Sequence, residues 1–325
     1  MFLAPDGAEI EIADSAAKFL ARAIPLDRLH GSGASPALSA DVRAELAAMG
    51  WFGLVLPEAD GGSGLSAVEH ALFYVEVGRH CGPVDILAQG LAAMVSDDRR
   101  LRSALLSGEQ GVALAVADGP TLRLLGGHDT TLALHVERDG ARLLDVSVIE
   151  TAPRPSLDPA TGMRTIVRGT PRTVAVSSNG DVWSLGQLGV AAMLVGVAES
   201  ALALIVEYAK VRETFGRKIG TYQAVRHACA DMALRAEAAR CQLWSAAAAL
   251  EARRSDAHAH LDAAKHLANR AAVMNADVDI QLHGGIGVSE EHHAHLLLKH
   301  GVLLARLFGS KRNLLARLLH AELEV

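Results

Sequence analysis

The spacing of hydrophobic residues changes twice along this chain of 325 residues. Before residue 110 and after about residue 185, apolar side chains recur at the three- and four-residue spacing of helices. Between these regions, short apolar segments alternate and are separated by Gly, Asp and Pro. The pattern predicts a mostly α fold with three parts: an N-terminal helical domain (1–110), a shortened β module (111–184) and a C-terminal four-helix bundle (185–325).

Turn and cap residues mark the predicted elements of the N-terminal part. Ser39 precedes the helical pattern DVRAELAAM and is a candidate N-cap, while Gly50 stands where that helix should end. The segment DGGSG at 60–64 predicts a turn, and a second helix is predicted over 66–80.

The two remaining parts have equally distinct patterns. Strands are predicted at 112–117, 121–125, 131–136, 142–146 and 172–177, in a mostly antiparallel module. The proline-rich stretch 150–163 is predicted to be an irregular loop. Helices of an antiparallel bundle are predicted at 185–211, 222–253, 258–283 and 291–306, with a short fifth helix at 311–322.

Composition excludes several classes of protein. Half of the residues are hydrophobic and the formal net charge is −6, so neither disorder nor a nucleic-acid partner is expected. The apolar runs are interrupted by charge, so no membrane span is expected. Three cysteines cannot form a disulfide framework, which favours reduced thiols and a cytoplasmic location.

The first candidate binding motif is RETFGRKIG at residues 212–220, between two predicted helices. Arg212 offers a planar fork of donors suited to phosphate oxygens, and Phe215 could lie against an adenine ring. Read by itself, the segment is better explained as a charged turn between helices.

The second candidate motif is QLHGGIG at residues 281–287, at the end of a predicted helix. Gly284 and Gly285 permit backbone conformations and close approaches that a side chain would block, which suits contact with a phosphate. The alternative is a glycine C-cap without a ligand.

Histidines after this motif raise the question of a metal site. His292 and His295 are spaced to share a helix face with Glu291. No second group of ligands with a recognisable spacing accompanies them, so we expect no metal. The sequence also lacks the nucleophile-elbow, P-loop and dinucleotide-binding patterns.

Taken together, several segments resemble the acyl-CoA dehydrogenase family of flavoenzymes. They are GWFGLVLPE (50–58), GGSG (61–64), VEVGR (75–79), YAKVRETFGRKIGTYQAV (208–225) and QLHGGIG (281–287). They occur in the family's order and span the chain outside the β module. The family architecture is helices, then a β domain, then a four-helix bundle.

The resemblance implies that the chain binds FAD at a subunit interface. Arg212 and Phe215 would come from one subunit and contact the pyrophosphate and the adenine. Gln281, Gly284 and Gly285 would come from the neighbouring subunit. The stretch 281–295, which begins with the second motif, then resembles a phosphate cradle at a helix end, and its histidines are incidental.

Two departures from the family pattern concern catalysis. The family uses a carboxylate to remove the α-proton of an acyl-CoA thioester while a hydride passes to the flavin. Phe308 stands where most members have this glutamate, and Gly186 and Gln187 stand at the position used by other members. The catalytic residue is therefore unknown. The family's T-E-P-x-x-G-S-D segment, which lines the flavin ring, is also missing; residues 115–120 are its nearest remnant.

Both losses resemble the short subunits of heteromeric acyl-CoA dehydrogenases of actinobacterial steroid degradation. The sequence thus predicts an FAD-associated subunit that pairs with a homologous catalytic subunit and acts on an acyl-CoA. Two alternatives stay open: a competent homomeric dehydrogenase with an unrecognised base, and a structural subunit that has lost flavin. Glu291 is not assigned as the base because it is expected at a helix start.

Overall fold

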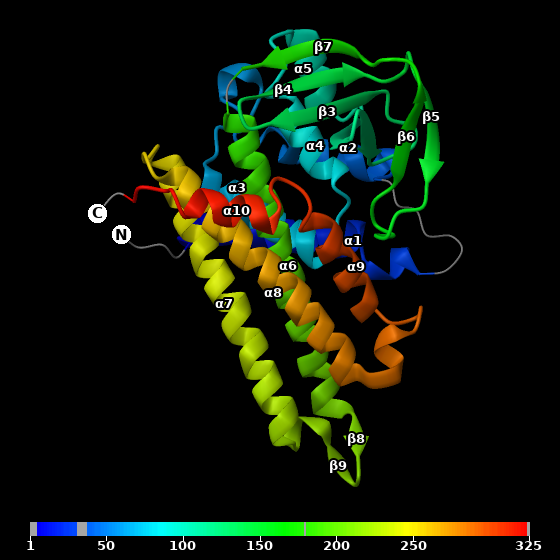
Figure 1. Ribbon diagram of the computed structural model, residues 1–325, viewed down its shortest axis with the longest axis vertical. Coiled ribbons are helices and arrows are strands. Elements are labelled where there is room, and N and C mark those ends of the chain that lie inside the picture. The colour runs from blue at the N-terminus through cyan, green and yellow to red at the C-terminus, as the bar shows by residue number, and fades with distance from the viewer. Residues whose placement is uncertain (1–4, 31–37, 179, 324–325) are drawn as a thin grey trace. The chain divides into compact units, whose positions relative to one another are not determined.

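The computed structural model describes residues 5–30, 38–178 and 180–323 and divides into two compact units (Figure 1). Unit 1 comprises Met1–Gly33, Ala71–Cys81 and Gln187–Val325, and unit 2 comprises Ala34–His70 and Gly82–Gly186. The predicted fold class, mostly α with a small β module, is confirmed. The predicted domain limits at 110 and 184 stay predictions.

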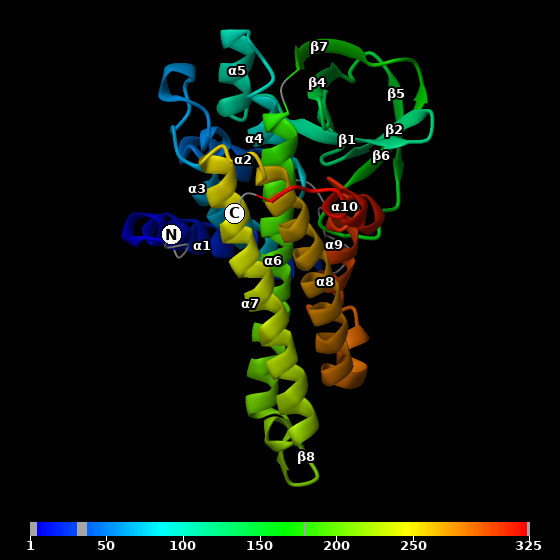
Figure 2. The same cartoon turned by 60° about the vertical axis from the view of Figure 1, so that its left-hand side comes forward.

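Unit 1 is built from long helices. They are α1 (Gly7–Ala23), most of α3 (Ala67–Arg79) and of α6 (Asp181–Val211), α7 (Gln223–Glu251), α8 (Ala257–His283), α9 (Ala294–Leu304) and α10 (Lys311–Leu318), with short 3₁₀ turns η1 (Leu26–Leu29), η4 (Ile219–Thr221) and η5 (Gly284–Val288). In both views, α6, α7 and α8 run alongside one another for most of their length (Figures 1 and 2).

The helices of the bundle match the predicted ranges to within a few residues, with two corrections. The helix predicted from residue 291 begins at Ala294, because residues 290–293 form turns. The helix predicted to reach residue 322 ends at Leu318; the side chain of Leu319 that follows is 82% exposed, so no packing extends the helix there.

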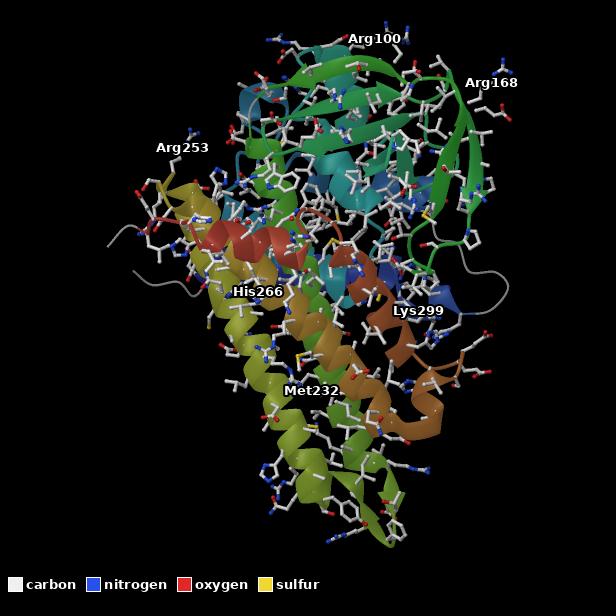
Figure 3. The ribbon with its side chains drawn as sticks, in the orientation of Figure 1. Arg100, Arg168, Met232, Arg253, His266 and Lys299 are labelled. Atoms are coloured by element: carbon white, nitrogen blue, oxygen red, sulfur yellow. The ribbon has the colours of Figure 1, made fainter. Side chains whose placement is uncertain are left out.

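A buried amide holds three helices of the bundle together. The side-chain nitrogen of Asn275 in α8 donates to the carbonyl of Ala198 in α6 at 3.1 Å and to that of Met232 in α7 at 3.0 Å. Figure 3 labels Met232 on α7. The amide oxygen accepts from Arg235 Nε at 2.9 Å. Because this buried amide has its hydrogen bonds satisfied, it fixes the register of the helices rather than destabilising the core.

Two glycines bring α3 and α6 into backbone contact. A Cβ at Gly78 would lie 2.0 Å from the carbonyl oxygen of Met193, and a Cβ at Gly196 would lie 2.0 Å from that of Val75. No side chain fits at either distance. The two helices therefore pack more closely than any other residue type at these positions would allow.

Helix α6 contains a longer apolar run than the sequence interpretation allowed. Its most apolar window has a mean hydropathy of 2.1, so by length and composition it could cross a membrane. In the structure, 67% of that window is buried inside the protein, as expected for the central helix of a bundle. Residues 182–198 contain no Asp, Glu, Lys or Arg, so charge does not interrupt this run.

Unit 2 combines short helices with a seven-stranded sheet. The helices are α2 (Ala40–Ala48), η2 (Trp51–Gly53), η3 (Glu58–Asp60), α4 (Asp85–Ala92) and α5 (Arg99–Leu106). The predicted cap is present, since Ser39 Oγ accepts from the backbone N–H of Val42 at 3.2 Å. Gly50 follows α2 with a left-handed φ of 79°, as the predicted end of that helix requires.

The sheet is mostly antiparallel, as predicted. Its strands are β1 (Val112–Asp118), β2 (Thr121–Leu125), β3 (Leu132–Glu137), β4 (Gly140–Asp145), β5 (Glu150–Arg154), β6 (Met163–Arg168) and β7 (Arg172–Ser177). Their order is β5-β6-β2-β1-β3-β4-β7, and the β1–β3 pair is parallel. A small apolar core packs on the sheet: Ala113, Ala115, Leu124, Ala133, Leu144 and Val146.

Strands β5 and β6 correct the predicted irregular loop at 150–163. Residues 150–154 pair with 163–168 although Pro153 lies within β5. A proline is compatible with this position because β5 is an edge strand, where one side of the backbone needs no ladder hydrogen bond. The prolines of this stretch led to the prediction of a loop, whereas pairing with β6 makes residues 150–154 a strand.

Candidate functional site

Arg212 and Phe215 lie on a two-stranded hairpin that joins α6 to α7. The strands are β8 (Glu213–Thr214) and β9 (Arg217–Lys218). Phe215 and Gly216 form the tip with φ of 52° and 76°, the pattern of a type I′ turn. A positive φ is uncommon for a phenylalanine, and its side chain is 98% exposed. The fold thus holds an aromatic ring in solvent at the end of a tight turn.

The backbone of Arg212 is fixed while its guanidinium is available. Its N–H donates to the carbonyl of Tyr208 at 2.8 Å, and its carbonyl accepts from Ile219 at 2.8 Å. The side chain is exposed and makes no ion pair with another residue of the described chain. An anchored arginine with an unpaired fork suits an anionic ligand that approaches from outside.

A pocket of about 530 Å³ lies at the base of this hairpin. Three cationic side chains line it, Lys210, Lys218 and Arg226. Cations gathered around an open pocket raise the local concentration of anions.

Gln281, Gly284 and Gly285 lie at the C-terminal end of α8. Gly284 has φ 68° and ψ −143°, a region that only glycine populates readily, and its N–H donates back to the carbonyl of Gln281. The backbone of Gly285 does not have a positive φ, so its conformation does not require a glycine. A Cβ there would meet nothing within 4 Å in the described part of the chain. Neither the backbone conformation nor the packing requires a glycine at 285. A glycine there leaves space in which a ligand can approach the backbone.

An aromatic contact joins the two motifs within one chain. The rings of Tyr208, one turn before Arg212, and His283, beside Gly284, have centroids 4.4 Å apart. His283 Nδ1 also lies 2.9 Å from Asp279 Oδ1. Burial lowers the pKa of His283, but the hydrogen bonds and charge of Asp279 outweigh it, so the pKa is raised overall. This favours an imidazolium directly beside the glycine pair.

The two positions at which the resemblance predicts a catalytic carboxylate, 308 and 187, hold other side chains. Phe308 is buried, with a φ of 52°, in the turn between α9 and α10. Gln187 in α6 is also buried and donates to Asp262 Oδ1 at 2.7 Å. Asp262 is therefore the carboxylate next to the alternative position. Arg317 donates to both of its oxygens, at 2.6 and 2.5 Å, so this carboxylate is engaged in an ion pair.

The remnant of the flavin-ring segment forms a tight hairpin. Strand β1 passes directly through Gly119 and Pro120 into β2, and the register closes at Asp118 and Thr121. The connection holds no additional residues that could extend as a loop.

The histidine-rich stretch differs from its expected position in a helix. Glu291 is exposed in a turn before α9, and His292 contacts His283 with ring centroids 4.3 Å apart. Asp27 and His30, far away in the sequence, lie beside His293. Sequence reasoning did not find this group, because its members are about 260 residues apart and only the spacing D-x-x-H hints at the first pair.

Comparison with known proteins agrees with these features. The family description "Acyl-CoA dehydrogenase, N-terminal domain" matches residues 7–97, and "Acyl-CoA dehydrogenase, C-terminal domain" matches residues 184–319. The β module is covered by neither match. The segments that resemble the family in the sequence likewise lie outside the β module.

Two relatives in Mycobacterium tuberculosis are similar over most of the chain. The acyl-CoA dehydrogenase FadE34 is 37% identical over 284 residues, covering 80% of this chain but only 39% of its own length. The chain thus spans well under half of that relative. The acyl-CoA dehydrogenase IpdE2 is 31% identical over 267 residues, covering 82% of this chain and 81% of its own.

Solved structures show the same fold. The structure titled "Tcur3481-Tcur3483 steroid ACAD G363A variant" has a TM-score of 0.79 at 25% identity, covering 96% of this chain and 97% of the other. Butyryl-CoA dehydrogenase from Megasphaera elsdenii has a TM-score of 0.81 at 18% identity, covering 98% and 99%. The two matched domains, the similarity to IpdE2 and the fold together place this chain in the acyl-CoA dehydrogenase family of flavin oxidoreductases.

Proposed function

We propose that this chain is the FAD-associated partner subunit of a heteromeric acyl-CoA dehydrogenase. The observation that carries the proposal is that this chain has residues suited to binding FAD but no carboxylate at the positions expected for the base. Residues suited to FAD lie on its surface, while Phe308 and Gln187 are buried at the two positions where the resemblance to the family would place the base. A bound FAD would accept the hydride, and a homologous subunit would supply the carboxylate that removes the α-proton.

The residues proposed for FAD are Arg212, Phe215, Gln281, Gly284 and Gly285. Arg212 and the cations of the neighbouring pocket would bind the pyrophosphate, and Phe215 would contact the adenine. Gly285 leaves room for the backbone to approach the cofactor. The Tyr208–His283 contact brings both motifs to the same end of one bundle. The division of the two motifs between neighbouring subunits stays a prediction.

Support for a heteromer comes from the similar steroid enzyme, whose title names two proteins, Tcur3481 and Tcur3483. The short β1–β2 hairpin supports it as well, because a chain without a flavin-ring segment needs that contact from elsewhere. The substrate class is a CoA thioester, and a bulky acyl group is favoured by the same relative. The cytoplasmic location stays a prediction.

The test is to measure acyl-CoA oxidation with a dye acceptor, with and without a catalytic homologue co-produced. General-base help is worth about 10²–10⁴-fold, so the chain alone should show little or no turnover and the complex should restore it. Glu291→Gln in this chain should leave the rate of the complex unchanged, because Glu291 is exposed in a turn.

Two outcomes favour the alternatives. A robust rate from the chain alone that Glu291→Gln abolishes would establish the homomeric enzyme and make Glu291 its base. An active complex in which the flavin absorbance is unchanged by Arg212→Ala would assign FAD binding to the partner alone, leaving a structural subunit.

A further inference from the structure

Three side chains that could bind a metal ion meet on one face of unit 1. They are Asp27 and His30, from the turn η1 and the residue after it, and His293, from the turn before α9. Their candidate ligand atoms all lie within 4.8 Å of one another. Asp27 Oδ1 is 2.9 Å from His293 Nε2, and the His30 and His293 rings are stacked with centroids 4.9 Å apart.

The hydrogen bonding of His30 resembles that of a metal-binding histidine, in which one ring nitrogen is held by a carbonyl and the other is left for the metal. Its Nδ1 lies 2.7 Å from the carbonyl oxygen of Glu290, and only a protonated Nδ1 can donate to a carbonyl. In the neutral ring the lone pair is then on Nε2. That atom is buried and has no hydrogen-bond partner in the described chain. A backbone carbonyl that holds the far nitrogen is the usual support of a metal-ligating imidazole.

A buried nitrogen lone pair without a partner is costly in a folded protein. A water molecule would satisfy it, and so would a cation. The neighbouring carboxylate of Asp27, whose side chain is 83% exposed, favours the cation because its negative charge attracts a positive ion. The exposed carboxylate also gives an ion a route from solvent.

We propose that Asp27, His30 and His293 form a site for a divalent transition-metal ion, with Zn²⁺ as the best match. Two imidazole nitrogens and one carboxylate oxygen suit zinc, which accepts four ligands and tolerates water as the fourth. Ligand atoms around one zinc lie about 3.3 Å apart, so small side-chain rotations would close the present group. The hard cations Mg²⁺ and Ca²⁺ are disfavoured, since they prefer oxygen ligands alone.

A third imidazole lies beside the site. His295 lies with its ring centroid 6.4 Å from that of His30, and its Nδ1 is also buried without a partner in the described chain. Its place beside His30 makes His295 a candidate for the fourth ligand.

A metal at this place would tie the turn after α1 to the segment that follows the glycine motif. His293 lies only a few residues beyond η5, which begins at Gly284. The ion would therefore fix the glycine segment from its C-terminal side. This role does not depend on the proposed flavin chemistry and can be measured without it.

The test is Zn²⁺ binding by the full chain after treatment with a chelator, with its partner subunit present if the chain requires one. Competition against a fluorescent zinc indicator should give one Zn²⁺ per chain. His30→Ala and His293→Ala should each weaken binding at least tenfold. The matched control His227→Ala, an exposed histidine in α7, should leave the affinity unchanged.

Folding and metal binding are separated by two further measurements. Thermal melting in chelator checks that each variant folds, and Asp27→Asn provides a variant that cannot disturb the core. Asp27→Asn should also weaken Zn²⁺ binding, and Co²⁺ should give visible absorption typical of a four-coordinate site. Absence of stoichiometric Zn²⁺ binding, or binding that is equal in all variants, would overturn the proposal and leave an Asp27–His293 ion pair stacked on His30.

Discussion

Tyr208 of α6 and His283 of α8 contact each other ring to ring, with centroids 4.4 Å apart. We expect Tyr208→Leu and His283→Leu to be non-additive, because each removes the partner of the other. The coupling should be about 0.5–1.5 kcal/mol in the free energy of unfolding, measured by a denaturant double-mutant cycle. The cycle cancels the separate cost of leaving Asp279 without its histidine. Additive effects would show that the contact carries no energy.

The glycine motif contains two glycines with opposite expected roles. Gly285→Val should leave the melting temperature nearly unchanged, because a Cβ there meets no described atom, while flavin content of the purified complex falls. Gly287→Ala should lower the melting temperature, because its Cβ would lie 2.7 Å from the carbonyl oxygen of Ile280. The checks are flavin absorbance per protein and thermal melting. Flavin retained at the wild-type level by Gly285→Val would contradict the proposed contact.

The ion pair between Asp262 and Arg317 predicts a large effect on stability. The side chain of Asp262 is 4% exposed, so Arg317→Met leaves a buried carboxylate without its cation. We expect a loss of about 3–5 kcal/mol in the free energy of unfolding, measured in urea. Adding Asp262→Asn should recover part of this loss, because it removes the uncompensated charge. Arg312→Met, at an exposed position of α10, is the matched control and should change little.

Lys265 predicts an unusual dependence of stability on pH. Burial lowers the pKa of this lysine from 10.5 to about 7, and its ammonium donates to Asn269 Oδ1 at 2.6 Å. The unfolded chain thus binds more protons than the folded chain between about pH 7 and 10.5, so this contribution to stability rises with pH in that window.

Lys265→Met removes the titrating group and should remove that rise. The stability of the variant relative to the wild type should fall as the pH increases from about 7.5 to 9, by at most about 1.4 kcal/mol per pH unit. Urea unfolding at several pH values measures this difference. The exposed Lys311→Met is the control. A difference that is constant over the window would show that Lys265 is charged in the folded protein.

Local signals in the sequence predicted much of the fold. Ser39 and Gly50 marked the limits of α2 because caps and left-handed glycines are set by adjacent residues. The strand β5 was missed because Pro153 disfavours a strand unless its unpaired side faces away from the sheet, and that depends on a partner elsewhere in the chain.

The candidate site was predicted in its parts but not in its assembly. Glycines at 284 and 285 and the arginine at 212 are visible in the sequence, because their conformations and charges belong to single residues. The contact of Tyr208 with His283 joins positions 75 apart, and that of Asp27 with His293 joins positions 266 apart. Without pairs of related sequences, nothing local connects such residues.

The backbone contact of α3 with α6 at Gly78 and Gly196 constrains how this chain can evolve. Each glycine must keep its place within its own helix, because one inserted residue would turn a side chain into the opposing carbonyl. The segment between α3 and α6 contains the seven strands, and its length does not change the position of either glycine within its own helix. A change in the length of the sheet would therefore leave the contact between the two helices intact.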